Sequence, residues 1–370
     1  MGRAHGRRPG PQQPHLYDHS SYRGRWLYDY AEEGEAEDLV YSRDSSRSES
    51  LGAEVRADWQ ATNWLRLVGA VEVFHSFVLA QEEYDEFEVS LDDRRAATSL
   101  GGFLHAEVAP HRNLTIDLGL RVDYRTRVGV TPTPRGAVIY RPSTNTTLKL
   151  LYGEAFRAPN AYEQYYHDRF TVQRAGALSP ERLRSVELAW EQTHAHFLRT
   201  TLSAYRYRLR GLISLEPNGH DDFVAYTNTG GATAMGVEAA VDARWPGIFE
   251  VRGSYALQRA ESDDGSELSN SPRHMFKLGM VVPVWGEKLQ VALDGSFLSP
   301  RRTLSDARSE RAVLLDLHVS SRGLLPGLEL RAGVRNLLDW RYGDPGSAEH
   351  VQDLIPQNGV TFDAGITYSF

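Results

Sequence analysis

The sequence predicts an all-β protein, specifically a transmembrane antiparallel up-and-down β-barrel with about sixteen strands present. Three observations support this fold class: apolar and polar residues alternate, short turns alternate with long polar segments, and tryptophans lie beside the short turns. Alternation with a period of two is typical of a β-strand. An apolar face opposite a polar or small-residue face indicates a strand between lipid and a wet lumen.

The clearest alternating segment is residues 360–370, at the end of the chain. One face carries Val360, Phe362, Ala364, Ile366, Tyr368 and Phe370, and the other carries only polar or small residues. The same pattern recurs at residues 114–125, 237–245, 313–320 and 328–335. A soluble β-sandwich strand has this pattern too, but its turns are uniformly short. Here the polar faces carry charges of both signs, which a wet lumen accommodates.

Short and long connections alternate along the chain. We expect short turns at residues 59–64, 110–113, 141–145, 245–247 and 284–288. Between them we expect long polar loops at residues 78–97, 157–181, 260–272, 299–310 and 337–358. Outer-membrane barrels have short periplasmic turns and long outer loops. The tryptophans beside the short turns suit an interfacial aromatic belt, with ordinary turn-capping aromatics as the alternative; they are Trp59, Trp64, Trp245 and Trp285.

Composition excludes several other classes of protein. The chain is 41% hydrophobic with a mean hydropathy of −0.45, and no run approaches the ~18 apolar residues of a helical span. It has no cysteine, which excludes disulfides, cysteine–zinc sites and thiol catalysis. Its net charge of −8 argues against nucleic acid as a partner. Because no known catalytic motif is present, we expect no catalytic residue, no metal site and no cofactor.

The N-terminal region is basic and rich in proline and glycine. We expect a disordered extension over residues 1–20 and a barrel domain over residues 21–370. No apolar signal segment or small-residue cleavage site follows Met1. We therefore expect the natural product to begin upstream of Met1, with a disordered extension on a short chain as the alternative.

Several motifs resemble, in order, those of the TonB-dependent outer-membrane receptors. Residues 148–163 are similar to the family's "YG.aFRAP…E" run, here with Phe156, Arg157, Ala158 and Pro159. Residues 179–188, 228–238, 270–274 and 334–342 resemble later family segments, and two of these contain Glu238 and Asn336. Phe370 resembles the terminal aromatic residue that barrel-assembly machinery reads. Residues 355–360 depart from the Pro-Gly-Arg-like turn that usually opens the last strand.

The resemblance implies a receptor in the outer membrane of a Gram-negative bacterium, in contact with outer-membrane lipid. It implies a barrel of about 22 strands with a plugged lumen, of which this sequence holds the C-terminal part. The implied function is high-affinity uptake of a scarce nutrient such as an iron-siderophore, cobalamin or haem. The implied partners are this small-molecule ligand, the barrel-assembly machinery, and the TonB complex acting through a plug domain.

Two other functions remain open at this point. The first is a plugless, passive, porin-like channel that closes with the strands present. The second is a secreted β-rich binding or hydrolytic domain.

The best ligand-binding candidates form an aromatic and polar cluster in the long segment after Pro159: Tyr162, Tyr165, Tyr166, His167 and Asp168. Aromatic rings with a histidine can stack on a siderophore, cobalamin or haem ring, and His167 can bind a metal. The alternative is packing between loops. The acidic run at residues 81–88, with Asp92 and Asp93, suits a cationic ligand but is also typical of a solvated loop.

One single arginine and one group of three arginines have predicted roles. We expect Arg157 to be structural, because Pro159 ends its strand and its guanidinium can pair with loop or lumen carboxylates. Three arginines share one face of a predicted strand, where facing lipid at the midplane costs about 2–4 kcal/mol each. They therefore point inward or lie outside the hydrocarbon, and we expect a lumen-lining ladder. It would comprise Arg206, Arg208 and Arg210, balanced by Glu187, Glu191, Glu238 and Asp242.

Overall fold

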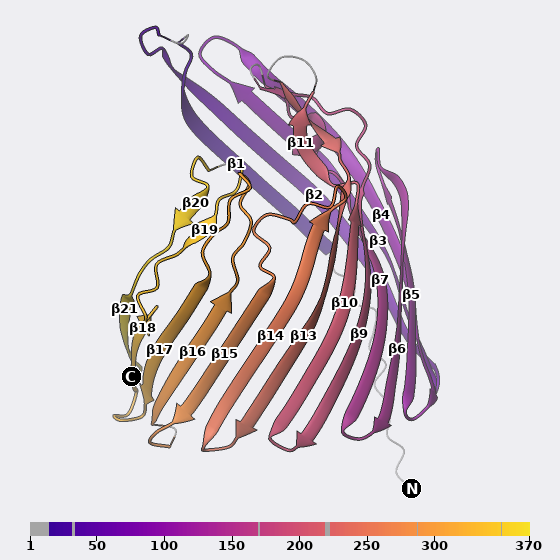
Figure 1. Cartoon of the computed structure of the whole chain (residues 1–370). Helices are drawn as coiled ribbons and strands as arrows, with labels where there is room; N and C mark the ends of the chain where they lie inside the picture. Colours follow the sequence, from indigo (N-terminus) through magenta and orange to yellow (C-terminus); the bar gives the residue numbers. More distant parts are fainter. Residues whose placement is uncertain (1–14, 32–33, 169–170, 219–222, 287, 349) are drawn as a thin grey trace. The chain divides into compact units, whose positions relative to one another are not determined.

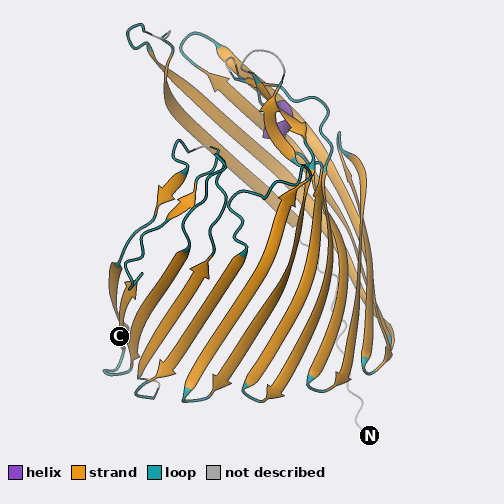
Figure 2. Ribbon diagram, viewed as in Figure 1, coloured by secondary structure: helices purple, strands orange, loops and turns teal. Residues whose placement is uncertain are grey.

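The computed structural model describes residues 15–31, 34–168, 171–218, 223–286, 288–348 and 350–370. Over these residues β-strand is the predominant secondary structure (Figure 2). The strands of the principal sheet follow one another in chain order, each beside its sequence neighbour (Figure 1). The all-β, up-and-down, antiparallel fold is therefore confirmed.

Within the described residues the principal sheet has sixteen strands. In chain order they are β1 (His15–Asp29), β2 (Leu39–Thr62), β3 (Leu65–Tyr84), β4 (Val89–His111), β5 (Leu114–Arg125), β6 (Gly129–Ser143), β7 (Thr146–Arg157), β9 (Glu181–Ala195), β10 (Leu198–Arg210), β13 (Gly231–Trp245), β14 (Phe249–Ser262), β15 (His274–Pro283), β16 (Leu289–Leu298), β17 (Ala312–Arg322), β18 (Leu328–Arg335) and β21 (Thr361–Tyr368).

The connections hold smaller elements. A three-stranded sheet combines β11 (Ile213–Pro217), β12 (Val224–Asn228) and β8 (Val172–Gln173), and a two-stranded sheet pairs β19 (Gly343–Pro345) with β20 (Leu354–Pro356). One short helix, α1 (Ala161–Tyr165), follows β7. Among the described residues, no helix has the length and hydrophobicity needed to cross a membrane.

The predicted turns and loops have different outcomes. All five short turns are confirmed, because a strand ends and the next begins at each of them. The predicted loop at residues 78–97 is wrong: β3 continues to Tyr84 and β4 begins at Val89. Polar side chains alternate along this hairpin while its backbone groups bond to the neighbouring strands. Polarity therefore marks where the strands leave lipid, and the strands themselves continue.

The N-terminal boundary also differs from the prediction. Residues 15–20 were expected to be disordered, but β1 begins at His15 and pairs with β2 in an unbroken register from His15↔Ala53 to Asp29↔Leu39. This strand was missed because it is too polar to show an apolar face. Residues 1–14 lie outside the described residues. At the other end, the expected strand at residues 360–370 is β21, which runs from Thr361 to Tyr368.

The chain divides into two compact units: residues up to Ala137 with 152–184 and 209–231, and residues 138–151 with 185–208 and 232–370. In the first unit, one face of β2–β5 exposes large apolar side chains: Leu51, Val55, Trp59, Val71, Val73, Leu100, Leu104, Leu118, Leu120 and Val122. The opposite face carries a charged network, in which Arg121 donates to Asp123 (Nε to Oδ2, 2.8 Å) and pairs with Glu72. An apolar outer face and a charged inner face are those of a membrane barrel wall.

The second unit repeats this division. Exposed apolar residues line its outer face, among them Leu202, Val237 and Val241. On the inner face, Glu191 pairs with both Lys149 and Arg199 (Nη2 to Oε2, 2.9 Å for Arg199). Pairing of this kind across neighbouring strands stabilises charges on the face that lines a wet lumen.

The predicted inward-facing arginine ladder is wrong. Tyr205 and Tyr207 stack on the inner face of β10 (ring centroids 4.7 Å apart), so Arg206 and Arg208 share the outer face of this strand with Leu202. Arg208 donates to the Thr233 hydroxyl (2.9 Å) and pairs with Asp263, beyond the end of β14. Arg208 lies ~10 residues along β10 from its turn, which is the length of one membrane crossing. Arg208 therefore lies at the end of the apolar band because of its height along the strand.

The two faces of β13 give a direct test of this assignment. Val241 and Ala240 lie at the same depth, with Val241 on the apolar face and Ala240 on the face that also carries Asp242 and Arg252. We expect Val241→Arg to destabilise the folded protein in phospholipid vesicles by about 2–4 kcal/mol, because it places a cation in lipid. The free energy of unfolding is measured by denaturant titration with tryptophan fluorescence. Ala240→Arg is the matched control, and equal destabilisation by both substitutions would contradict the assignment of faces.

Candidate functional site

In the first unit, the segment after β7 folds over the inner face of the extended strands β2–β4. The Gln81 side chain donates to the Ala161 carbonyl (3.2 Å), and the Tyr166 phenol lies close to the Glu83 carboxylate. Strand β3 therefore supports α1 and the residues that follow it. Each of these contacts uses the part of β3 that had been predicted as a loop.

Arg157, at the end of β7, connects three elements of this unit. It donates through Nη1 to both carboxylate oxygens of Glu163 in α1 (2.8 and 2.9 Å). Through Nε and Nη2 it donates to both oxygens of Glu181, the first residue of β9 (2.6 and 2.8 Å). Glu181 also accepts from the backbone N–H of Ile213 in β11 (2.8 Å). The bidentate pair with Glu181 and the two bonds from Nη1 to Glu163 orient both carboxylates as well as attract them.

The start of α1 is held by a capping box. Asn160 accepts from the Glu163 backbone N–H (2.8 Å), and Glu163 accepts from the Asn160 backbone N–H (2.9 Å). This reciprocal pair satisfies two helix-terminal donors. Glu163 therefore serves both the helix cap and Arg157, and it is buried.

The predicted aromatic cluster divides into two parts. Tyr162 stacks on Tyr166 (centroids 4.3 Å apart, planes at 20°) and meets the Tyr226 ring edge-on at 6.1 Å. Burial raises the pKa of Tyr162 to about 12, and burial also raises that of Tyr166. These two tyrosines pack against each other, with Tyr166 half-buried and Tyr162 exposed on its other side, and this is the packing alternative stated above.

Tyr165 has different surroundings. Its ring faces three guanidinium groups, with the Arg95 carbon 3.8 Å from the ring centroid and the Arg127 and Arg174 carbons each 5.3 Å away. A cation within about 6 Å of an aromatic face is attracted by the ring quadrupole. Tyr165 thus gathers positive charge from β4, from the β5–β6 turn and from the segment before β9.

Tyr165, Arg95 and Arg127 line a cavity of about 910 Å³ that lies within the first unit. This volume is within the usual range for small-molecule sites. The rest of its wall mixes apolar side chains, hydroxyls and further charges, including Phe74, Ser76, Thr98, Arg125 and Gln164. Such a wall suits a ligand with rings and anionic or polar groups.

His167 and Asp168 do not line this cavity. The His167 Nδ1 lies 3.1 Å from the Tyr165 carbonyl oxygen. Asp168 accepts from the Thr171 backbone N–H (2.6 Å) and from the Val172 backbone N–H at the start of β8 (2.8 Å). In the described part of the chain, no group of three or more metal-ligating side chains is arranged to hold a metal ion.

Sequence reasoning missed the arginines of this cavity. Arg95 was assigned to a loop, and Arg127 gives no sequence signal because a left-handed residue is usually glycine, asparagine or aspartate. The structure places Arg127 at φ = +71°. A bulky residue in this conformation is strained, and such strain concentrates at functional sites.

The chain matches the model of the family described as "TonB dependent receptor-like, beta-barrel" over residues 11–337. This match covers most of the chain. The chain belongs to this family.

Known relatives agree with this assignment. Over 168 residues, this receptor barrel is 27% identical to the vitamin B12 transporter BtuB of Vibrio cholerae, a match covering 45% of this chain and 26% of that protein. Its fold is similar to the ferripyoverdine receptor of the Pseudomonas aeruginosa outer membrane (TM-score 0.74, 14% identity, 97% of this chain, 54% of that chain). It is also similar to the copper transporter OprC (TM-score 0.74, 16% identity, 97% and 62%).

The chain therefore spans about half the length of these solved receptors. The relatives named here are transporters and receptors rather than enzymes. These comparisons give no support to the passive, porin-like channel.

The other motif residues of the receptor barrel have distinct surroundings. Asn336 is buried at φ = +49°, and its side chain donates to the carbonyls of Trp340 (3.0 Å) and Asn358 (3.2 Å). Phe156 lies under the Arg125 guanidinium (5.7 Å), while Ala158 and Pro159 line the cavity. Glu238 is exposed on β13, and Phe370 is fully exposed beyond β21.

The arrangement around Arg157 predicts a local stabilising role. We expect Arg157→Met to destabilise the segment at residues 160–168 by about 1–3 kcal/mol, because the carboxylates of Glu163 and Glu181 lose their partner. Hydrogen exchange of these amides, followed by mass spectrometry, measures the effect. The matched control is Arg184→Met, which removes an exposed arginine whose one ion-pair partner among the described residues is Glu154 (3.1 Å). Unchanged exchange in the Arg157 variant would contradict the role.

The surroundings of Glu83 predict that the stability of the segment at residues 160–168 depends on pH. Burial, with the charges of Asp168 and Asp44, raises the pKa of Glu83 above its ordinary value, and one of its carboxylate oxygens is buried without a hydrogen-bond partner. Because the folded-state pKa is raised, the stabilisation is complete below the ordinary pKa and is lost as pH rises through the raised value.

We expect amides 161–168 to be more protected at pH 4 than at pH 8, after correction for intrinsic exchange. Glu83→Gln should remove most of this difference, whereas Glu82→Gln, on the exposed face of the same strand, should preserve it. The same pH profile in the Glu83 variant and in the native chain would contradict the prediction.

Proposed function

We propose that this chain forms the part of the barrel wall that contacts the ligand in an outer-membrane receptor, and that this receptor takes up a scarce nutrient. The observation that carries the proposal is the arginine- and tyrosine-lined cavity on the inner face of the first unit. The wall is built from strands that continue past one membrane crossing, so the cavity lies on their outer, extracellular part.

The chemistry of the wall favours a ligand with a ring system and anionic groups. Guanidinium groups bind carboxylates and other oxyanions, and the Tyr165 ring offers a face for stacking. An iron-siderophore, cobalamin or haem has these features. The similarity to a vitamin B12 transporter and to a ferripyoverdine receptor supports a nutrient of this kind.

Uptake through such a barrel requires a source of energy and a movable plug. We propose that the TonB complex supplies the energy through a plug domain, and that the charged inner face of the barrel contacts this plug. The paired charges on that face, such as Arg121 with Asp123 and Glu72, offer polar contacts for a plug surface.

Binding of a defined panel of probes tests the proposal. Ferripyoverdine, ferric enterobactin, cyanocobalamin, haemin and Cu²⁺ are titrated separately into the detergent-solubilised chain, and tryptophan fluorescence and calorimetry report binding. We expect at least one probe to bind. We expect the double variant Tyr165→Ala, Arg127→Gln to weaken that binding about tenfold or more, because it removes a stacking face and a cation.

The control carries the same two substitutions away from the cavity. Tyr124→Ala with Arg112→Gln alters the apolar outer face of β5 and a short turn, and it should leave binding unchanged. If no probe binds, or if both double variants weaken probe binding equally, the proposed site is contradicted.

A further inference from the structure

The outer face of β1–β3 in the first unit changes character along the strands. On β2, the outward residues from Trp59 to Leu51 are apolar or small, which matches a membrane crossing of about 9–11 residues. The outward residues beyond Leu51 are polar: Glu49, Arg47, Ser45 and Arg43. On β1 the corresponding outward residues beyond Tyr17 are His19, Ser21, Arg23 and Arg25.

Four exposed arginines on this face form what we call the outer arginine cluster: Arg23, Arg25, Arg43 and Arg47. The strand register places them together, with Arg25 directly opposite Arg43 and Arg23 opposite Ser45. Like charges that face each other directly across two strands destabilise the pair. An anion bound between them would remove this repulsion.

Protein groups compensate the cluster only in part. Arg47 pairs with Glu49, which His19 and Tyr17 also approach (3.9 and 3.4 Å). Within the described chain, no carboxylate lies within ion-pair distance of Arg23, Arg25 or Arg43. The outward positions 19–27, 41–49 and 78–84 carry these four arginines and two glutamates, Glu49 and Glu82. This patch is therefore positive in a chain whose net charge is −8.

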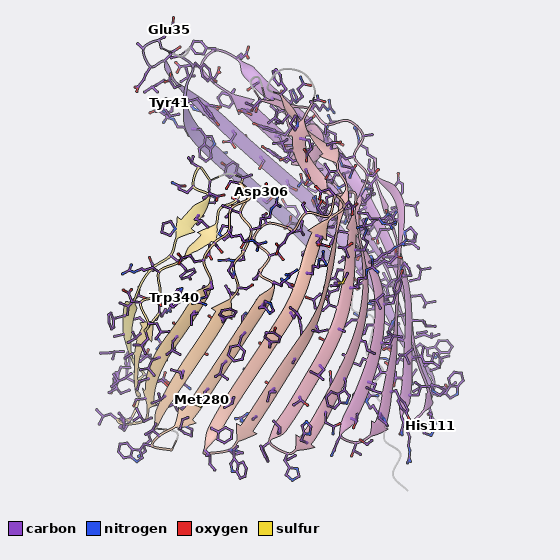
Figure 3. The ribbon with its side chains drawn as sticks, viewed as in Figure 1. Glu35, Tyr41, His111, Met280, Asp306 and Trp340 are labelled. Carbon is purple, nitrogen blue, oxygen red and sulfur yellow. The ribbon has the colours of Figure 1, made fainter. Side chains whose placement is uncertain are left out.

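Aromatic rings hold two of the arginines in place. The Arg25 guanidinium carbon lies 3.8 Å from the centroid of the Tyr41 ring, and that of Arg43 lies 5.9 Å from the Tyr84 ring. Figure 3 shows Tyr41 on the extended part of the sheet, and the strand register puts this ring on the same face of β2 as Arg43 and Arg47. A guanidinium stacked on a ring keeps its N–H groups available for an oxyanion.

The height of the cluster identifies its surroundings. Arg47 is four residues beyond Leu51 and Arg43 is eight, so they lie ~13 and ~27 Å further along the strand at about 3.4 Å per residue. With the ~40° tilt of barrel strands, these positions lie about 10–20 Å above the apolar band. This is the depth of lipid headgroups and of the sugars attached to them, and it is continuous with the lipid-facing surface.

We propose that the outer arginine cluster binds the phosphate groups of a phosphorylated glycolipid in the outer leaflet of the membrane. The proposal rests on the outer-membrane location in the proposed function but not on its nutrient site. Phosphate suits the cluster because planar guanidinium groups bind its oxygens in a bidentate manner. Acyl chains of the same lipid would lie along Leu51, Val55, Val71 and Val73, directly below the arginines.

Binding of lipopolysaccharide to the full chain in neutral detergent tests the proposal, with native mass spectrometry and thermophoresis as readouts. We expect the triple variant Arg23→Gln, Arg25→Gln, Arg43→Gln to bind roughly 100-fold more weakly, since each arginine near an anionic lipid surface contributes about fivefold. Lipopolysaccharide without its phosphates should bind the native chain equally weakly. Raising the salt concentration should also weaken binding by the native chain.

Two further variants keep the test independent of folding. The triple Arg→Lys variant at the same positions retains the charge and should stay within about fivefold of the native affinity. The control Arg56→Gln, Arg252→Gln, Arg331→Gln removes the same charge from strand positions outside the cluster and should bind like the native chain. Heat-modifiable electrophoretic mobility shows that each variant is folded.

The outcomes separate the two proposals. Native-like lipopolysaccharide binding by the Gln variant, equal binding of the dephosphorylated glycolipid, or equal binding of phosphatidylglycerol vesicles would overturn the lipid site alone. Loss of lipid binding in the Gln variant with unchanged binding of the nutrient probe supports the site. A chain absent from the outer-membrane fraction would overturn the location and the lipid site together.

Discussion

The structure depends on one constraint: in lipid, every backbone N–H and C=O group has to bond within the protein. A continuous antiparallel sheet in chain order satisfies this constraint, and its period of two then assigns each side chain to lipid or to the lumen. Val241 and Ala240 are neighbours in sequence, yet the Val241 side chain faces lipid and the Ala240 side chain faces the lumen. The charged pairs of the inner face, such as Glu191 with Lys149, follow from the same division.

The strands are longer than a membrane crossing requires, and the candidate site depends on the additional length. Beyond the lipid band, β3 and β4 need no apolar face, so they carry polar side chains toward the inside and toward the outside. Inside, they support α1 and the Tyr165 cavity. Outside, β1–β3 present the outer arginine cluster. One extended hairpin system thus presents two polar surfaces, one on each face of the sheet.

The local motif around Arg157 explains how a loop can form a rigid wall. Its guanidinium joins the end of β7, the capped helix α1 and the start of β9 through two carboxylates. The Phe-Arg-Ala-Pro segment therefore acts through geometry: Pro159 ends the strand, and Arg157 holds the returning chain. The aromatic residues that follow take different roles, because Tyr162 and Tyr166 stack on each other while Tyr165 turns toward three arginines.

Alternation and turn chemistry are local, and the sequence by itself therefore determined the strand type, the five short turns, the lipid-facing positions of the clearly alternating segments and the family motifs. It also indicated that Arg157 would meet carboxylates, although Glu163 and Glu181 are distant from each other in sequence. Only the tertiary structure decided that residues 78–97 extend a hairpin, that Arg206 and Arg208 face outward, and which tyrosine lines the cavity. These features depend on register and on contacts between distant strands, and a single residue of register exchanges lumen for lipid.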